Sequence, residues 1–197
     1  WFSNADFYRR HNLDLVMLDY RGYGKSSGRI GSQAQLEADV RAAWASIAPH
    51  YAGKQRVFIG RSLGSALAAG LAAEVQPELT VLVSPCASMA ALAAEHYRWV
   101  PAALLRYPLR TDVALTRVTS PLLLLHGKRD EIIGAHHSER LLHVAPHAER
   151  VLIDGSEGSS VRMAPCCRPI PGDAIVGYLG RGEGLVVHTT ECRVGRR

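Results

Sequence analysis

The chain has 197 residues, of which 47% are hydrophobic and 21% are charged, and its formal net charge is +5. This composition excludes a wholly disordered chain, no apolar run reaches the roughly 18–20 residues of a membrane span, and so mild a charge does not by itself indicate a nucleic-acid partner. The four cysteines form no CxxC pair and no secretory leader is visible, which favours a reducing compartment and a cytoplasmic location.

Strand-like and helix-like segments alternate over residues 1–158. The predicted strands are apolar runs bounded by turn residues: Leu13–Leu18, Gln55–Ile59, Thr80–Val83, Pro121–Leu125 and Val151–Ile153. The predicted helices are a segment opened by a capping box at Ser32 and Gln35, then Leu63–Val75, Met89–Val100, Pro101–Arg106 and Ala135–Ala145. Such alternation predicts βαβ units, and therefore an α/β fold with a doubly wound, mostly parallel sheet.

The pattern G-x-S-x-G occurs twice, at Gly24–Gly28 and at Gly60–Gly64. A nucleophile elbow requires a strand that runs into a sharp turn and then a helix. Only the second match has this context, because a predicted strand ends at Ile59 and a predicted helix begins at Leu63. We therefore expect Ser62 to be a nucleophile, with Gly60 and Gly64 as the small residues of its turn. The first match is interpreted as a glycine-rich loop.

Three segments resemble the α/β-hydrolase superfamily and occur in the order typical of that family. They are Asp19–Gly28 (DYRGYGKSSG), Gly60–Gly64 at the elbow, and Pro121–Asp130 (PLLLLHGKRD). The resemblance covers residues 1–155. It points to the serine-hydrolase branch that contains serine-aminopeptidase-like and monoacylglycerol-lipase-like proteins.

The resemblance implies a role for each matching residue. Ser62 would attack a carbonyl, the backbone N–H of Leu63 would stabilise the oxyanion, and Asp130 would orient a catalytic histidine. The implied substrate is an ester, thioester or amide of a small or lipid-like molecule, and no metal or organic cofactor is implied. An acyltransferase that uses the same serine stays open.

Two features depart from the family pattern. Residues 1–11 resemble the remnant of a helix, so the domain looks truncated at its N-terminus and its sheet incomplete at one edge. The family carries its histidine in the turn after the last strand, whereas the turn at 154–160 contains none. His188 is the only histidine after that strand and is kept as a possible base. We interpret His126 as a packed residue, and His136 and His137 as surface residues.

Helix and strand patterns weaken after residue 158, and glycine and proline become frequent. We therefore divide the chain into a partial α/β-hydrolase domain at 1–158, with a short cap-like segment at 87–118, and an irregular tail at 159–197. A frameshift or an unrelated fused segment would each produce this change. Cys166 and Cys167 lack recognisable partners at metal-binding spacing, so we interpret them as reactive or incidental thiols.

Two functions stay open. The first is a serine hydrolase that forms an acyl-enzyme on Ser62 and acts on a small or acyl substrate. The second is an inactive hydrolase-like fragment that binds a ligand or partner. The sequence determines neither the substrate nor the oligomeric state.

Overall fold

A computed structural model describes residues 5–97, 99, 101, 104–154, 162–167, 175–180 and 184–194. The chain divides into two compact units, residues 1–54 and residues 55–197. Among the helices in the described ranges, none has the length and hydropathy needed to cross a membrane.

The first unit contains two helices, α1 (Ala5–Arg10) and α2 (Gln33–Ile47), and a short 3-10 helix at Ala48–Tyr51. Ser32 caps α2, because its side chain accepts the backbone N–H of Gln35 at 3.1 Å. The side chain of Gln35 accepts the N–H of Gly31 at 2.8 Å, one residue before the cap. The predicted helix start is therefore confirmed, with the return bond of the capping box displaced by one position.

The predicted strand at Leu13–Leu18 is wrong. The segment contains no strand, and Leu13, Val16, Met17 and Leu18 are 37–52% exposed. A strand persists only when its backbone groups pair with a neighbouring strand. In the ranges that the structure describes, no strand pairs with residues 13–18. Within the described residues the apolar pattern at 13–18 is therefore not enough to form a strand.

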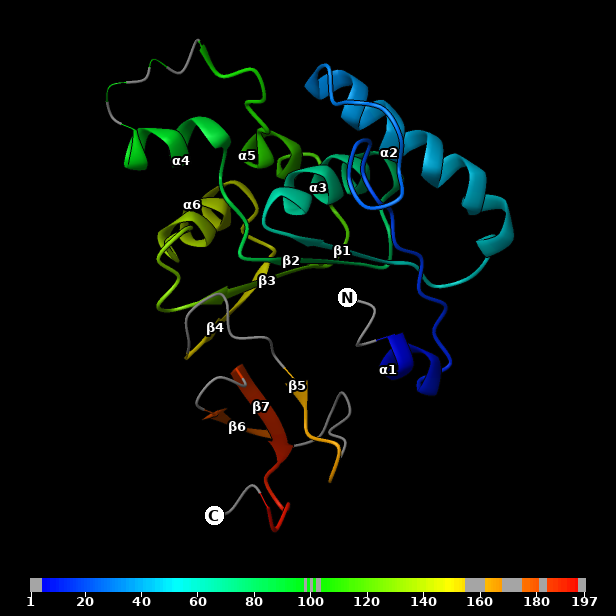
Figure 1. Ribbon diagram of the computed structural model, residues 1–197, viewed down its shortest axis with the longest axis vertical. Coiled ribbons are helices and arrows are strands. Elements are labelled where there is room, and N and C mark those ends of the chain that lie inside the picture. The colour runs from blue at the N-terminus through cyan, green and yellow to red at the C-terminus, as the bar shows by residue number, and fades with distance from the viewer. Residues whose placement is uncertain are drawn as a thin grey trace. The chain divides into compact units, whose positions relative to one another are not determined.

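The second unit is built on a parallel four-stranded sheet in the order β1-β2-β3-β4 (Figure 1). Its strands are β1 (Val57–Arg61), β2 (Leu79–Val83), β3 (Leu122–Gly127) and β4 (Glu149–Ile153). Helices α3 (Leu63–Val75), α5 (Thr111–Leu115) and α6 (His136–Val144) lie along one side of this sheet, and α4 (Met89–His96) follows β2. The predicted α/β fold with a mostly parallel sheet is confirmed.

The core of this unit lies between the sheet and these helices. Side chains alternate between the two faces of a strand, so one set from β2 and β3 faces inward. Leu82 and Leu124 are fully buried and cluster with Ala72 of α3, Leu115 of α5 and Leu141 of α6. This packing fixes the carboxyl ends of β2 and β3 relative to the helices. Asp130 follows the end of β3, and Ser62 follows the end of β1, which pairs with β2.

The tail contains a second, three-stranded sheet in the order β5-β7-β6. Its strands are β5 (Arg162–Met163), β6 (Ile175–Gly180) and β7 (Gly184–Thr189). β6 and β7 pair in antiparallel fashion from Ile175↔Thr189 to Gly180↔Gly184, and β5 pairs in parallel with β7. The expectation of an irregular tail is therefore wrong for these strands. Short apolar runs such as Leu185–Val187 become strands because a neighbouring segment pairs with them.

Candidate active site and candidate metal centre

Ser62 occupies a strained turn between β1 and α3. Its backbone has φ 51° and ψ −119°, a region that non-glycine residues enter only when the surrounding structure enforces it. Its N–H donates to the carbonyl of Val83 at 2.9 Å, and its own carbonyl accepts the hydroxyl of Ser65 at 2.6 Å. Ser62 is thus a half-buried serine with positive φ at the junction of a strand and a helix.

Gly60 is required by the close packing of this turn. A Cβ atom at this position would lie 2.5 Å from the carbonyl oxygen of Gly64 and 2.7 Å from Cβ of Ala68. Leu63 is the first residue of α3, and the N–H groups of a first helical turn have no acceptor within the helix. The turn thus places the backbone N–H of Leu63 directly after Ser62.

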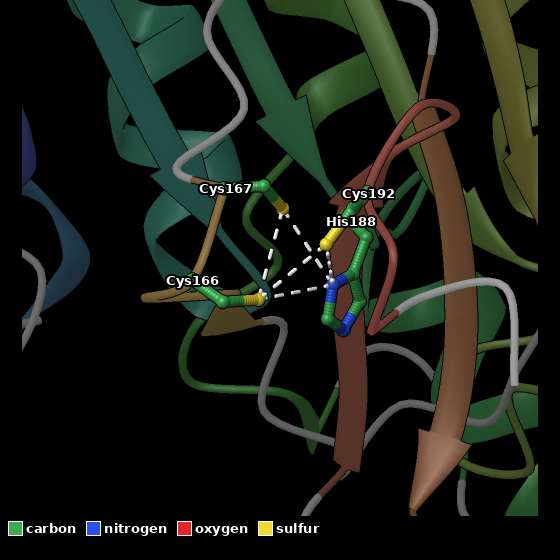
Figure 2. A group of neighbouring side chains, drawn as sticks. All are labelled: Cys166, Cys167, His188 and Cys192. Carbon is green, nitrogen blue, oxygen red and sulfur yellow. Dashed lines mark hydrogen bonds between the residues drawn. The ribbon is translucent and has the colours of Figure 1, made fainter.

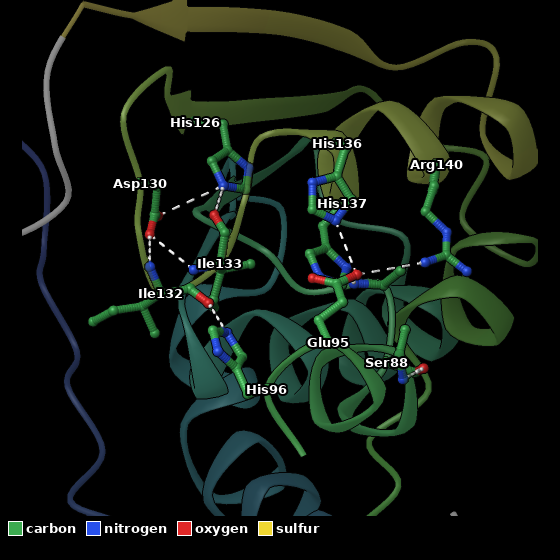
Figure 3. Close-up of polar contacts among 12 residues, drawn as sticks. Ser88, Glu95, His96, His126, Asp130, Ile132, Ile133, His136, His137 and Arg140 are labelled. Atoms are coloured by element: carbon green, nitrogen blue, oxygen red, sulfur yellow. Dashed lines mark hydrogen bonds and ion pairs between the residues drawn. The ribbon is translucent and has the colours of Figure 1, made fainter. Parts of the chain in front are cut away.

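Asp130 is buried and held by backbone donors (Figure 3). It follows β3 and is 7% exposed. Its Oδ1 accepts the N–H groups of Ile132 at 3.0 Å and Ile133 at 2.9 Å. Two such bonds hold the carboxylate in one orientation. Asp130 is therefore an ordered buried carboxylate and not a solvated loop residue.

His126 packs beside this carboxylate. It is 1% exposed, and its Nε2–H donates to the carbonyl of Ile133 at 2.6 Å. Burial lowers the pKa of His126, although the bond to Ile133 and the charge of Asp130 act in the opposite direction. The ring is therefore neutral near pH 7, and its interpretation as a packed residue is confirmed.

The surface position predicted for His137 is wrong. This side chain is fully buried, its Nδ1 accepts the N–H of Ala87 at 3.2 Å, and its Nε2 lies 3.1 Å from Oε2 of Glu95. Neighbouring helical residues point about 100° apart, so of two adjacent histidines one can face the core. His136 is the exposed one, and its Nε2 lies 2.9 Å from Oε1 of Glu95.

Glu95, His136 and His137 lie close enough to suggest a metal site, but the hydrogen bonds argue against one. Because Nδ1 of His137 accepts a backbone N–H, the proton of the neutral ring is on Nε2. That nitrogen therefore donates to Glu95 and has no lone pair for a cation. Burial opposes the ionisation of Glu95, but its hydrogen bonds to His136 and His137 and its electrostatic interaction with these rings outweigh burial and lower its pKa.

A second cluster lies in the tail and joins Cys166, Cys167, His188 and Cys192 (Figure 2). The Nδ1 atom of His188 lies 3.4, 3.5 and 3.3 Å from the three sulfur atoms, in that order. Sγ of Cys166 lies 4.0 Å from that of Cys167 and 3.6 Å from that of Cys192. Tetrahedral zinc, with Zn–S of about 2.3 Å and Zn–N of about 2.0 Å, implies edges of about 3.5–3.8 Å. The distances in the cluster scatter around these edges.

The chemistry of the cluster also suits a cation. Desolvation and the neighbouring thiols of Cys192 and Cys167 raise the pKa of Cys166 to about 11. Thiols that oppose one another's ionisation become stable as thiolates when a metal ion neutralises them. His188 and Cys192 are buried, so the cluster is shielded on one side from water.

The sequence did not predict this cluster, because Cys166 and Cys167 had no recognisable partners at metal-binding spacing. The missed signal is the combination of an adjacent cysteine pair with a His-x₃-Cys motif, His188 and Cys192, that lies on and just after a strand. His188, the possible base, directs its Nδ1 at three thiols.

The parallel sheet and its flanking helices form an α/β-hydrolase fold. The sequence profile of the serine aminopeptidase S33 family matches residues 4–112, and the chain belongs to this family.

Related proteins agree with this assignment. An uncharacterized protein of Mycobacterium tuberculosis is 38% identical over 146 residues, which are 72% of this chain and 51% of that protein. Human alpha/beta hydrolase domain-containing protein 17C is 29% identical over 157 residues, 78% of this chain and 46% of that protein. The chain thus spans about half the length of the curated relatives it matches.

Solved structures share the fold. An alpha-beta serine hydrolase homologue from Coxiella burnetii has a TM-score of 0.53 at 21% identity, over 70% of this chain and 57% of that chain. The Pyrococcus furiosus esterase has a TM-score of 0.53 at 23% identity, over 70% of this chain and 59% of that chain.

The end of the chain resembles a different family. Residues 151–196 match the profile of the RelA/SpoT RIS domain. This match covers all of β5, β6 and β7 and includes the four residues of the second cluster.

Proposed function

We propose that the α/β-hydrolase part is a serine hydrolase that forms an acyl-enzyme on Ser62. The observation that carries the proposal is the backbone of Ser62, which has φ 51° at a junction of strand and helix. A conformation that costs on the order of 1–3 kcal/mol in a non-glycine residue is characteristic of functional positions. The buried carboxylate of Asp130 after β3 is the second support.

In this mechanism the hydroxyl oxygen of Ser62 attacks the carbonyl carbon of an ester, thioester or amide. The developing oxyanion accepts the N–H of Leu63, and collapse of the tetrahedral intermediate expels the alcohol, thiol or amine. Water then releases the acid from the serine. A base must take the proton of Ser62, and Asp130 would orient that base. Residues 155–187 contain no histidine. We therefore propose that the base lies outside this range.

The proposal is tested by labelling with a fluorophosphonate, read by intact mass, in parallel with a thermal melt. We expect stoichiometric labelling of the wild type, none of Ser62→Ala, and labelling slower by about 10⁴-fold in Asp130→Asn. Ser26→Ala is the matched control, because Ser26 belongs to the other G-x-S-x-G segment and its hydroxyl donates to the carbonyl of Asp19. A wild type that melts cooperatively but is not labelled would instead indicate an inactive hydrolase-like domain.

We also infer that Cys166, Cys167, His188 and Cys192 bind a structural zinc ion. Support comes from the three sulfur atoms and one ring nitrogen, whose spacing fits the edges of a tetrahedron around zinc. Three thiolates and one imidazole favour zinc over magnesium or calcium, which prefer oxygen ligands. Four protein ligands fill a tetrahedral site and leave no position for substrate, so its role would be structural.

The zinc proposal is tested by metal analysis of purified protein. We expect one equivalent of zinc in the wild type and in His143→Ala, whose histidine is exposed on α6. Cys192→Ala and His188→Ala are expected to lose most of the metal. Cobalt substitution adds an independent readout, because tetrahedral thiolate-bound Co²⁺ absorbs intensely in the visible range. Metal content unaffected by either ligand variant would overturn the proposal.

A further inference from the structure

Ile132 and Ile133, which follow Asp130, are each held through both the N–H and the carbonyl of their backbone (Figure 3). The N–H groups of Ile132 and Ile133 donate to Oδ1 of Asp130. The carbonyl of Ile133 accepts Nε2–H of the buried His126 at 2.6 Å. The carbonyl of Ile132 lies 2.8 Å from Nε2 of His96, a residue of α4. The orientation of the carboxylate therefore depends on His96 and His126. Both rings act on it indirectly, because they bond to the carbonyls of Ile132 and Ile133.

His96 follows Glu95 in sequence. Glu95 contacts the later part of the segment that begins at Asp130, at the start of α6. Its carboxylate lies 2.9 Å from His136, 3.1 Å from His137 and 3.9 Å from Arg140. Adjacent residues at the end of α4 thus hold both the loop after Asp130 and the first turns of α6. We call this pair of contacts the Glu95–His96 clasp. It ties the helix that follows β2 to the segment that carries the acid.

His137 extends the connection toward the serine. Its Nδ1 accepts the N–H of Ala87, which lies in the segment that leaves β2 after Val83. The carbonyl of Val83 accepts the N–H of Ser62 at 2.9 Å. The segment from Val83 to Ala87, which leads from β2 to α4, is therefore held at both ends. The N–H of Ser62 bonds to Val83, and His137, which contacts Glu95, bonds to Ala87.

We propose that Glu95 and His96 are positioning residues that keep Asp130 oriented for the reaction at Ser62. This inference rests on the proposed hydrolase function and deepens it. Neither side chain needs to touch substrate, because each acts through the backbone of residues 130–137. Its consequence is that α4, in the cap-like segment at 87–118, and the acid move as one unit.

The first test compares fluorophosphonate labelling rates. His96→Ala removes the donor to Ile132 and is expected to slow labelling roughly 10-fold, since small displacements of catalytic groups have effects of this order or larger. His96→Gln is expected to restore most of the rate, because its amide N–H reaches about the same point as Nε2. Glu95→Ala should resemble His96→Ala, and Glu95→Gln should be intermediate. The controls are His147→Ala and Glu139→Gln, which alter exposed residues.

The second test needs no activity and measures amide hydrogen exchange of Ile132 and Ile133 by NMR. We expect exchange of both amides to be faster in His96→Ala than in the wild type and to recover in His96→Gln, at unchanged melting temperature. Unchanged exchange in His96→Ala would overturn the clasp even if labelling slowed. Faster exchange with an unchanged labelling rate would overturn its role in the reaction.

The two measurements also separate this inference from the function on which it rests. If the wild type folds but is not labelled at all, the hydrolase proposal fails and with it the role of the clasp in catalysis. Exchange at Ile132 and Ile133 would then decide only whether the clasp orders the carboxylate of Asp130.

Discussion

Oδ2 of Asp130 lies 3.6 Å from Nε2 of His126, and both side chains are fully buried. The short bond of that nitrogen goes to the carbonyl of Ile133, so a neutral imidazole and a carboxylate stand side by side without forming a strong ion pair. A buried neutral histidine next to an ordered acid makes the free energy of unfolding depend on pH in a defined direction.

Stability is expected to fall as the pH drops below 6.5. Burial is the main cause of the lowered pKa values of both His126 and His137. The unfolded chain therefore binds protons at a pH where the folded chain does not, and acid favours unfolding. Each histidine contributes a slope of up to about 1.4 kcal/mol per pH unit between its folded pKa and 6.5. Urea unfolding at pH 7.5, 6.5 and 5.5 measures this.

The matched comparison for this pH dependence is His143→Gln, which changes an exposed histidine and should leave the slope unaltered. A free energy of unfolding that is constant between pH 7.5 and 5.5 would show that these rings are not held neutral.

Gly60→Ala is expected to disrupt the elbow. The added methyl group would lie 2.5 Å from a backbone oxygen and 2.7 Å from the backbone of Ser65, and neither atom belongs to a flexible side chain. We expect a loss of at least about 2 kcal/mol in stability, as for other overpacked sites, together with loss of fluorophosphonate labelling. Gly53→Ala is an instructive contrast, because a Cβ there meets nothing within 4 Å, although its positive φ carries a smaller cost.

Gln76 is expected to stabilise the end of α3 through its side chain. Its Nε2 donates to the carbonyl of Arg117 at 2.8 Å, and its Oε1 accepts the N–H groups of Thr119 and Ser120 at 2.9 and 3.1 Å. Gln76→Ala should cost about 1–3 kcal/mol, because it leaves these backbone groups without their partner. Gln76→Gly should recover part of this loss, since residue 76 has φ 50°. Equal melting temperatures for wild type and Gln76→Ala would refute this account.

Removal of metal is expected to unfold the tail sheet selectively. Chelation should accelerate amide exchange in β7, which carries His188, while α3 keeps its protection because its packing involves β1, β2 and α5. Hydrogen exchange with mass spectrometry, with and without chelator, measures both at once. The Cys192→Ala variant should exchange like the chelated wild type and should not respond to added zinc. Equal amide exchange rates in β7 with and without chelator would argue against a metal centre.

The sequence predicted the helices and strands of the second unit well where residues within or next to an element determine it. The helix predicted at Leu63–Val75 has those bounds in the structure, because the turn at Ser62 and the left-handed residue Gln76 fix its two ends. The strands at β2 and β3 were found because parallel strands packed against helices are continuous apolar runs. The burial of Asp130 was not evident from its neighbours, since it depends on the backbone of Ile132 and Ile133 folding back on it.

The failures have one physical cause, which is dependence on distant partners. Residues 13–18 have strand-forming side chains but no strand beside them in the described part of the chain. His137 is buried because of Ala87 and Glu95, which lie 50 and 42 positions away in sequence. The four tail ligands approach one another only after β5 pairs with β7. Periodicity reports none of these contacts, and of the three only the tail cluster leaves a motif in the sequence, the adjacent cysteine pair with His188 and Cys192.

Among the side chains that the structure describes in and around the tail sheet, Ala164, Val187 and Cys192 are the buried apolar ones. Segments of about 40 residues seldom hold a fold without a staple such as a metal or a disulfide. If zinc is that staple, the chain leaves the ribosome with its C-terminal region dependent on the metal supply of the cell. Under zinc starvation this region would stay open to proteases. The abundance of the intact chain would then report on zinc availability.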